Sequence, residues 1–143
     1  MGYVQVEELL GGEKILGRKL RSINDFIELG RKGIKKSALR HLATNMSLTW
    51  RDMAKLLPIT ERTLQRYQMQ KLMNQIVSEQ ALQLAEVVAM GIDVFGDREN
   101  FLTWLSLPCA ALGERKPIEL LGSRFGIELV VDELGRIAHG IPA

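Results

Sequence analysis

Cysteine is almost absent from this chain, and so are long hydrophobic runs. Cys109 is the only cysteine among the 143 residues, which excludes an internal disulfide and any metal or redox site built on paired cysteines. The longest apolar stretch, residues 81–95, is interrupted by Glu86 and Asp93 and is too short and too charged to span a bilayer. The N-terminus has no basic segment ahead of an apolar run, so no signal peptide is indicated. We therefore expect a cytoplasmic protein that does not enter a membrane.

Catalytic signatures are missing as well. The two histidines, His41 and His139, lie far apart in the sequence, and no GxGxxG, GxxxxGK, HExxH or GxSxG motif is present. The neighbouring carboxylates Asp132 and Glu133 would point to different faces of a helix, which favours two solvated groups over a catalytic pair. We predict that the protein is not an enzyme and that it has no metal site and no cofactor.

Negative charge is scarce in the first half of the chain. Residues 1–75 hold 14 lysines and arginines against 7 aspartates and glutamates, whereas residues 76–143 hold 5 against 10. Lys35, Lys36 and Arg40, for example, are expected on the side of one helix that faces away from its apolar residues. This asymmetry favours a polyanion as partner of the first half and a different partner for the second. Charge alone leaves open that the basic helices are ordinary solvated surfaces.

What the sequence does contain is helical periodicity. Apolar residues recur at spacings of three and four, and no segment alternates convincingly with a period of two. The expected helices cover residues 22–33, 34–44, 49–57, 60–67, 78–95, 97–108, 117–121 and 127–138. Polar residues that suit a helix start stand at five of these positions: Ser22 or Asn24, Thr49, Thr60, Ser78 and Asp97. We predict an all-α fold.

The same pattern divides the chain into three parts. Residues 1–20 are mixed in composition and punctuated by glycine, so we expect a poorly ordered segment there. Residues 21–76 form a first helical domain with a basic surface. Residues 77–143 form a second helical domain, which begins with the longest helix.

Residues 50–67 match the spacing of a DNA-binding helix-turn-helix. Such a motif needs a small residue where its two helices cross and apolar residues that lock the pair together. Ala54 supplies the small residue, and the locking positions are Met53, Leu57, Ile59, Leu64 and Tyr67. Arginine and glutamine can each contact a base edge through two hydrogen bonds, and threonine can hold a phosphate. The predicted DNA-binding residues are therefore the exposed ones of the second helix: Thr60, Glu61, Arg62, Gln65 and Arg66.

Pro58 departs from this motif. The corresponding position is normally glycine with a positive φ, whereas the proline ring fixes φ at about −65°. We therefore expect a turn that differs in detail. The alternative is a helical hairpin in a bundle, whose apolar spacing would look similar, but the basic surroundings favour DNA binding.

The long helix at residues 78–95 predicts self-association. It carries more apolar surface than one chain of this size is expected to cover. Helix-turn-helix proteins usually contact two half-sites through two-fold symmetry. We therefore predict a homodimer whose interface lies on Leu84, Val88, Ile92 and their neighbours.

The last third of the chain carries a specific motif. It consists of ALG from Ala111, followed by P-x-E-LL, G-x-E-LV and, from Leu134, LGRI-x-HG. This pattern resembles the C-terminal toxin-binding domain of the Xre/MbcA/ParS antitoxins, and the first half resembles the Xre-type helix-turn-helix bundle of the same antitoxins. The resemblance covers residues 24–141. It departs at Lys116, where the family favours threonine or serine, and this removes a side-chain N-cap.

The resemblance implies an antitoxin of a type II toxin–antitoxin pair, which binds and inhibits a RES-domain toxin that consumes NAD and binds operator DNA to repress its own operon. It implies a toxin-binding surface at the end of the chain, made of Leu134, Gly135, Arg136, Ile137, His139 and Gly140. Arg136 would offer a guanidinium fork to a carboxylate or to a phosphate-binding pocket. Without the resemblance, Arg136 and His139 are better explained as ordinary residues of a last helical turn. The alternative function is a helix-turn-helix transcription regulator with no toxin partner.

Overall fold

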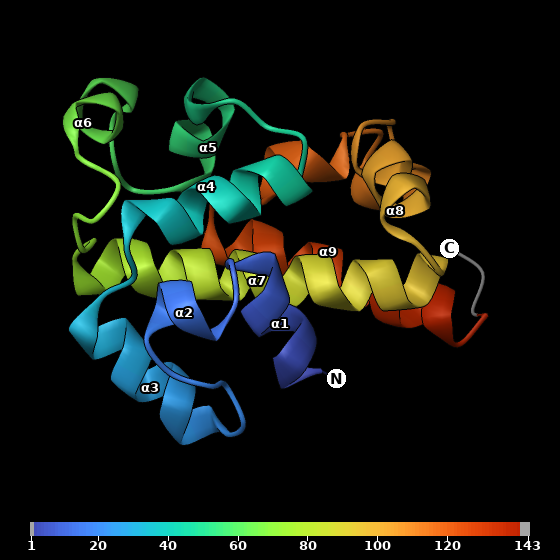
Figure 1. Cartoon of the computed structure of the whole chain (residues 1–143). Helices are drawn as coiled ribbons and strands as arrows, with labels where there is room; N and C mark the ends of the chain where they lie inside the picture. Colours follow the sequence, from blue (N-terminus) through green and yellow to red (C-terminus); the bar gives the residue numbers. More distant parts are fainter. Residues whose placement is uncertain (1, 141–143) are drawn as a thin grey trace. The chain divides into compact units, whose positions relative to one another are not determined.

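The computed structural model describes residues 2–140, and helices make up most of that range (Figure 1). Its α-helices are α1 (Tyr3–Leu9), α2 (Glu13–Leu16), α3 (Ile23–Lys32), α4 (Lys36–Asn45), α5 (Trp50–Leu56), α6 (Glu61–Arg66), α7 (Gln75–Phe95), α8 (Arg98–Leu105) and α9 (Arg124–Ala138). Two short 3-10 helices, η1 (Ala110–Leu112) and η2 (Pro117–Leu120), connect α8 to α9. Extended pairing within residues 2–140 is limited to isolated bridges, Lys35–Leu72 and Cys109–Arg115. The predicted all-α class is confirmed, and none of the described helices is both long and apolar enough to cross a membrane.

The chain folds as two compact units. The first extends to Ala89 and the second begins at Met90, so the boundary lies inside α7. The division that we predicted after residue 76 falls earlier, within the first turn of α7. The apolar pattern of α7 continues without a break past residue 89, so composition gives no sign of the boundary.

Residues 2–20 contain two helices, α1 and α2, contrary to the prediction of a poorly ordered segment. α1 and α2 pack against each other and against α4, and Leu10 and Leu20 are fully buried. The buried carboxylate of Glu7 accepts a hydrogen bond from the Leu20 N–H at 2.9 Å. Gly11 and Gly12 have φ values of 100° and 88°, which other residues rarely adopt, so these glycines form the turn between the two helices.

Side-chain caps begin several helices where the sequence predicted them. Each cap oxygen accepts the backbone N–H three residues further along: Thr49 from Asp52 at 3.2 Å, Thr60 from Thr63 at 3.1 Å and Asp97 from Asn100 at 2.7 Å. Ser22, and not Asn24, is the N-cap residue of α3, but here the contact is reversed, because the Ser22 backbone N–H donates to the Asp25 carboxylate at 3.1 Å. These contacts depend only on residues close in sequence, which is why they could be predicted.

Ser78 does not begin the long helix. α7 begins at Gln75, because the Asn74 side-chain oxygen accepts the Val77 N–H at 2.9 Å. Ser78 lies fully buried in the first turns of α7, where its hydroxyl accepts the Ile34 N–H at 3.0 Å. From sequence alone, a serine whose hydroxyl binds a backbone N–H of a distant segment cannot be told from a serine that caps its own helix.

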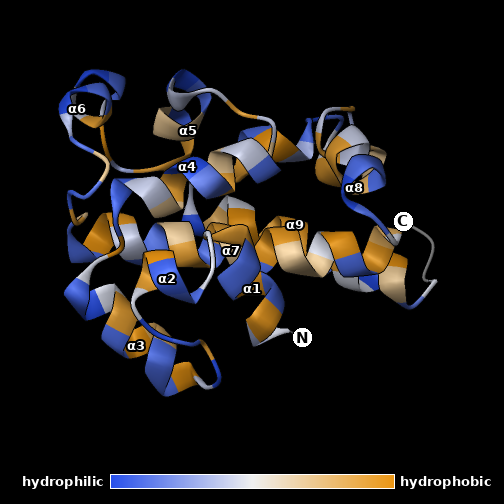
Figure 2. Ribbon diagram, viewed as in Figure 1, coloured by the Kyte–Doolittle hydropathy of each residue, from blue (hydrophilic) through white to orange (hydrophobic). Residues whose placement is uncertain are grey.

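The second unit has a small core built around aromatic rings. The ring centroids of Phe95, Phe101 and Trp104 lie 5.4–6.2 Å apart. α9 packs against η1 and η2, and α8 packs against η2. Pro117 opens η2, and Lys116 before it provides no side-chain cap, as the sequence indicated. Figure 2 shows that α9 carries both hydrophobic and hydrophilic residues.

The apolar stripe of α7 is covered within the chain. Leu84 and Val88 are fully buried and Ile92 is half-buried. Leu84 and Val88 therefore do not form the exposed interface that we predicted, whereas the half-buried Ile92 and the homodimer itself stay predictions. α7 contributes to both units, and a helix with that role needs apolar residues on more of its circumference than a helix with one packing partner.

Candidate functional site

α5 and α6 form a helix-turn-helix pair in the first unit. The two helices pack against each other, and the locking residues Met53, Leu57 and Leu64 are buried. Between the helices, the Ile59 N–H donates to the Leu57 carbonyl at 2.8 Å, a hydrogen bond that spans Pro58. This is the pattern of an inverse γ-turn, whose central φ of about −75° suits proline. The turn therefore differs from the usual glycine turn, as predicted.

The predicted DNA-binding residues lie together on α6. Arg62, Gln65 and Arg66 are exposed, and Glu61 is half-buried and accepts a hydrogen bond from the Gln65 amide at 3.0 Å. The exposed Thr60 uses its hydroxyl oxygen to cap the helix. The outer side of α6 thus presents two guanidinium groups and one amide, which are the groups that contact base edges and phosphates most often.

A buried lysine holds the C-terminal end of α6, although its sequence context predicted an exposed side chain. Lys36, predicted at the surface, is 5% exposed. Its ammonium nitrogen donates to the Tyr67 carbonyl at 2.8 Å and to the Gln65 carbonyl at 3.4 Å. The same nitrogen lies 5.2 Å from the centroid of the Trp50 ring. Lys36 therefore joins the first turn of α4, the start of α5 and the end of α6.

Burial lowers the pKa of Lys36, and the neighbouring charge of Arg40 lowers it further. The charge is therefore held inside the protein at a cost in desolvation. Carbonyl oxygens at a helix C-terminus and an aromatic face both attract a cation, so the surroundings of Lys36 offset that cost.

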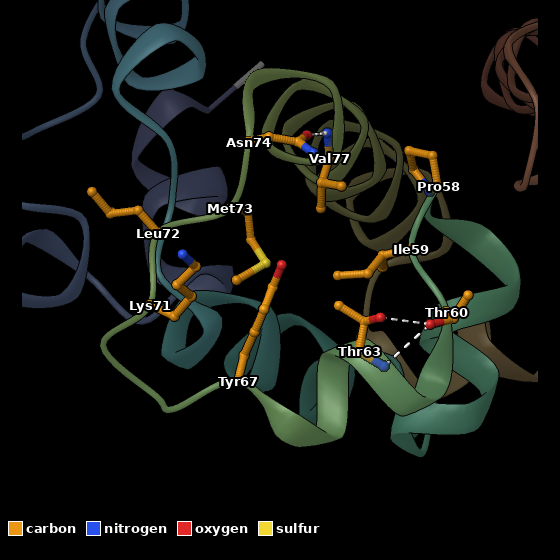
Figure 3. A pocket seen from close by; sticks show the side chains of 10 residues that line it. All are labelled: Pro58, Ile59, Thr60, Thr63, Tyr67, Lys71, Leu72, Met73, Asn74 and Val77. Carbon is orange, nitrogen blue, oxygen red and sulfur yellow. Dashed lines mark hydrogen bonds between the residues drawn. The ribbon is translucent and has the colours of Figure 1, made fainter.

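A groove of about 460 Å³ lies beside α6 (Figure 3). Its lining comes from the turn, from α6 and from the segment that leads into α7: Pro58, Ile59, Thr60, Thr63, Tyr67, Lys71, Leu72, Met73, Asn74 and Val77. Figure 3 shows Ile59, Tyr67 and Met73 directed toward its middle. The Lys71 ammonium lies 5.3 Å from the centroid of the Tyr67 ring. Lys71 and Tyr67 thus add a cation and a hydroxyl to the surface beside α6. Lys71 was not among the residues predicted from sequence, because it lies outside the helix-turn-helix motif.

The predicted toxin-binding residues do not form one surface on α9. Leu134 is fully buried and belongs to the core, so its prediction as a contact residue is wrong. Gly135 and Ile137 are half-buried, whereas Arg136, His139 and Gly140 are exposed. Because Leu134 faces the core, its neighbour Gly135 on the same helix is only partly exposed.

Arg136 is already paired within the chain. Its Nε lies 3.0 Å from a carboxylate oxygen of Glu133, and the Glu133 side chain is 7% exposed while that of Arg136 is 46% exposed. The expectation that Glu133 is solvated is therefore wrong, because the guanidinium of Arg136 accompanies its carboxylate. Glu133 occupies the Nε edge of the guanidinium, so the terminal nitrogens can still donate to a carboxylate or a phosphate of a partner.

Two exposed apolar residues on α9 escaped the sequence analysis. Phe125 is 77% exposed and Leu129 is 42% exposed. They lie four residues apart and off the buried stripe formed by Ile127, Val130 and Leu134. That offset is visible in the sequence, so a helical projection of residues 124–138 could have found them.

Two protein families match this chain, and their matches follow one another. Residues 25–86 match the antitoxin Xre-like helix-turn-helix domain. Residues 90–140 match the antitoxin Xre/MbcA/ParS C-terminal toxin-binding domain. The first match contains α5 and α6, and the second contains α8 and α9. α1 and α2 precede both matches.

One curated relative is the protein Antitoxin Xre of Yersinia enterocolitica (serotype O:8, biotype 1B). It is 37% identical over 65 residues, which make up 45% of this chain and 44% of that protein. The match therefore spans less than half the length of this relative. A solved structure, the MbcT-MbcA toxin-antitoxin complex of M. tuberculosis, contains a chain with a similar fold. The TM-score is 0.54 at 19% identity, over 76% of this chain and 96% of that chain, so this likeness concerns the fold.

Proposed function

Because the chain belongs to the Xre/MbcA/ParS antitoxins, we propose that it binds and inhibits a RES-domain toxin that consumes NAD and that it represses its own operon by binding operator DNA. The observation that carries this proposal is the order of the two matched domains in one chain. A DNA-binding domain ahead of a toxin-binding domain suits a protein whose two partners bind different parts of it. The proposed place of action is the cytoplasm.

The DNA contact is assigned to α6. Arg62, Gln65 and Arg66 would contact base edges in the major groove, and Thr60 would approach a phosphate. The basic character of the first unit supports this assignment, because each contacted phosphate releases counterions and strengthens binding. A homodimer would bring two copies of α6 to the two halves of an operator, through an interface other than Leu84 and Val88.

The toxin contact is assigned to the exposed end of α9. Arg136, His139 and Gly140 remain available there, and Gly140 has a φ of 67° that suits a close backbone approach. Arg136 would donate from its terminal nitrogens to a carboxylate, or it would occupy the position of a substrate phosphate. Losing a buried contact of this kind typically costs about 2–5 kcal/mol of binding free energy.

The test is co-expression with the protein encoded by the neighbouring gene, with growth and cellular NAD as readouts. The wild-type chain should restore both, and Arg136→Ala should restore them less well. The matched control is Arg62→Ala, which removes the same charge from the DNA-binding unit and should protect fully. If the wild-type chain neither restores growth nor co-purifies with the toxin but still binds its promoter, the protein is a transcription regulator without a toxin partner.

A further inference from the structure

The outward side of α9 carries the most exposed large hydrophobic residue of the described chain. Phe125 leaves 77% of its surface in water, and Leu129, one turn further along, leaves 42%. A phenylalanine in this position exposes apolar area that folding does not cover. Two such residues at a spacing of four form one patch on a helix, which marks a candidate binding surface.

The backbone under Phe125 is held firmly. Ser123 caps the helix by accepting the Gly126 N–H at 3.1 Å. Gly126 itself is buried so closely against η2 that a Cβ atom there would overlap the carbonyl oxygen of Leu120. The first turn of α9 is therefore fixed on both sides of Phe125, and a side chain presented from a fixed backbone loses little entropy on binding.

Charged side chains surround the patch. The Arg124 guanidinium lies 3.7 Å from the Glu128 carboxylate along the same helix. Asp132 and Arg136 follow at seven and eleven residues from Phe125, so they share its side of the helix. Both signs of charge are present. An apolar centre with a charged rim is the usual arrangement at an interface between two proteins that also exist apart.

We propose that Phe125 and Leu129 are the apolar anchor through which this chain binds its toxin, with Arg124, Glu128, Asp132 and Arg136 as the rim of the interface. This inference rests on the proposed function, because it takes the RES-domain toxin as the partner. The patch lies within residues 90–140, which match a toxin-binding domain. A second copy of the chain fits the patch less well, since permanent homodimer interfaces are larger and more apolar than two side chains among charges.

The test measures binding of the purified full-length chain to the purified RES-domain toxin by calorimetry. Phe125→Ala should weaken binding by about 30-fold or more, and Leu129→Ala by less, because a central aromatic anchor contributes most. Leu107→Ala is the matched control. Leu107 belongs to the same unit and is 55% exposed but lies outside α9, so its loss should leave the affinity within about 3-fold of wild type. Circular dichroism and operator binding should be unchanged in all three variants.

The outcomes separate this inference from the proposed function. If the wild-type chain does not bind the toxin, the proposed function fails and the inference fails with it. If the wild-type chain binds and Phe125→Ala binds equally well, the inference alone is overturned and the toxin contact lies elsewhere. If Phe125→Ala keeps its toxin affinity but sediments as a smaller species than wild type, the patch joins two copies of this chain, which also overturns the inference.

Discussion

Lys36 places a positive charge where the helix-turn-helix pair meets the rest of its domain. The ammonium group bonds to two carbonyls at the end of α6 and lies over the Trp50 ring at the start of α5. The spacing of the neighbouring apolar residues predicted a solvated position for this lysine. Because its contacts join three helices, we infer that Lys36 positions α6 without contacting DNA itself.

Lys36→Met tests this role, since methionine fills a similar volume and cannot donate to the carbonyls. We expect the free energy of unfolding to fall by about 1–3 kcal/mol, because the partly buried Tyr67 carbonyl loses its donor. We also expect operator affinity to fall, because α6 loses its attachment to α4. Chemical denaturation and gel-shift titration measure the two effects.

Lys35→Met is the control for charge. It removes the same positive charge from the neighbouring residue, which is half-buried and lies outside the contacts of Lys36 with α6. Both variants weaken the general attraction to DNA equally. If Lys35→Met lowers operator affinity and stability as much as Lys36→Met does, Lys36 acts only through its charge and the positioning role is refuted.

At the scale of the element, α9 contains two glycines with opposite surroundings. A Cβ on Gly126 would overlap the Leu120 carbonyl oxygen, whereas a Cβ on Gly135 would meet no atom within 4 Å. Gly126→Ala should therefore destabilise the protein by about 1–3 kcal/mol through the forced shift of α9. Gly135→Ala should stabilise it by about 0.5–1 kcal/mol, because alanine favours a helix interior.

Thermal denaturation followed by circular dichroism compares these two variants directly. The substitution is the same and the helix is the same, so helix propensity alone predicts equal gains. If Gly126→Ala melts at or above the temperature of Gly135→Ala, then η2 moves away from the added methyl group without a loss of stability. In that case the first turn of α9 is not fixed in the way that the structure indicates.

Elements of this fold were predictable from sequence where their causes are local. Thr49, Thr60 and Asp97 cap helices by accepting the N–H of a residue three positions further along. The periodic apolar residues predict where the helices themselves lie. Ser78 has the same chemistry but its hydroxyl serves Ile34, which is distant in sequence. The N-terminal helices were missed because the Glu7–Leu20 hydrogen bond and the packing on α4 also join distant residues.

The candidate site shows the same limit. The helix-turn-helix spacing correctly predicted that Arg62, Gln65 and Arg66 are exposed on α6, because the spacing along a helix decides which residues share a side. The C-terminal LGRI-x-HG motif could not show that Leu134 is buried in the core. A sequence motif records which residues recur in a family and not which way each side chain faces.

At the scale of the whole molecule, charge is divided unevenly between the two units. With the boundary at residue 89, the first unit has 14 lysines and arginines against 9 carboxylates, and the second has 5 against 8. DNA should therefore bind only the first unit, with an affinity that falls steeply as salt is added.

Gel-shift titrations at several salt concentrations test this division with Arg62→Ala and Arg66→Ala. Each substitution should cost about 1–3 kcal/mol of binding free energy if the arginine contacts a base, and each should lower the salt slope by about 1 if it contacts a phosphate. Arg124→Ala, which removes an exposed arginine from the second unit, should leave both quantities unchanged. Wild-type affinity and salt slope in the double variant of Arg62 and Arg66 would exclude α6 as the DNA-binding helix.

The two tryptophans of the chain fall one in each unit. Trp50 lies beneath the Lys36 ammonium, and Trp104 lies among phenylalanine rings, so the two indoles have different surroundings. Intrinsic fluorescence therefore contains two separate signals. Replacing either tryptophan with phenylalanine leaves a single tryptophan, so the tryptophan emission then comes from one unit. Unfolding, DNA titration and toxin titration can then each be assigned to one half of an unlabelled protein.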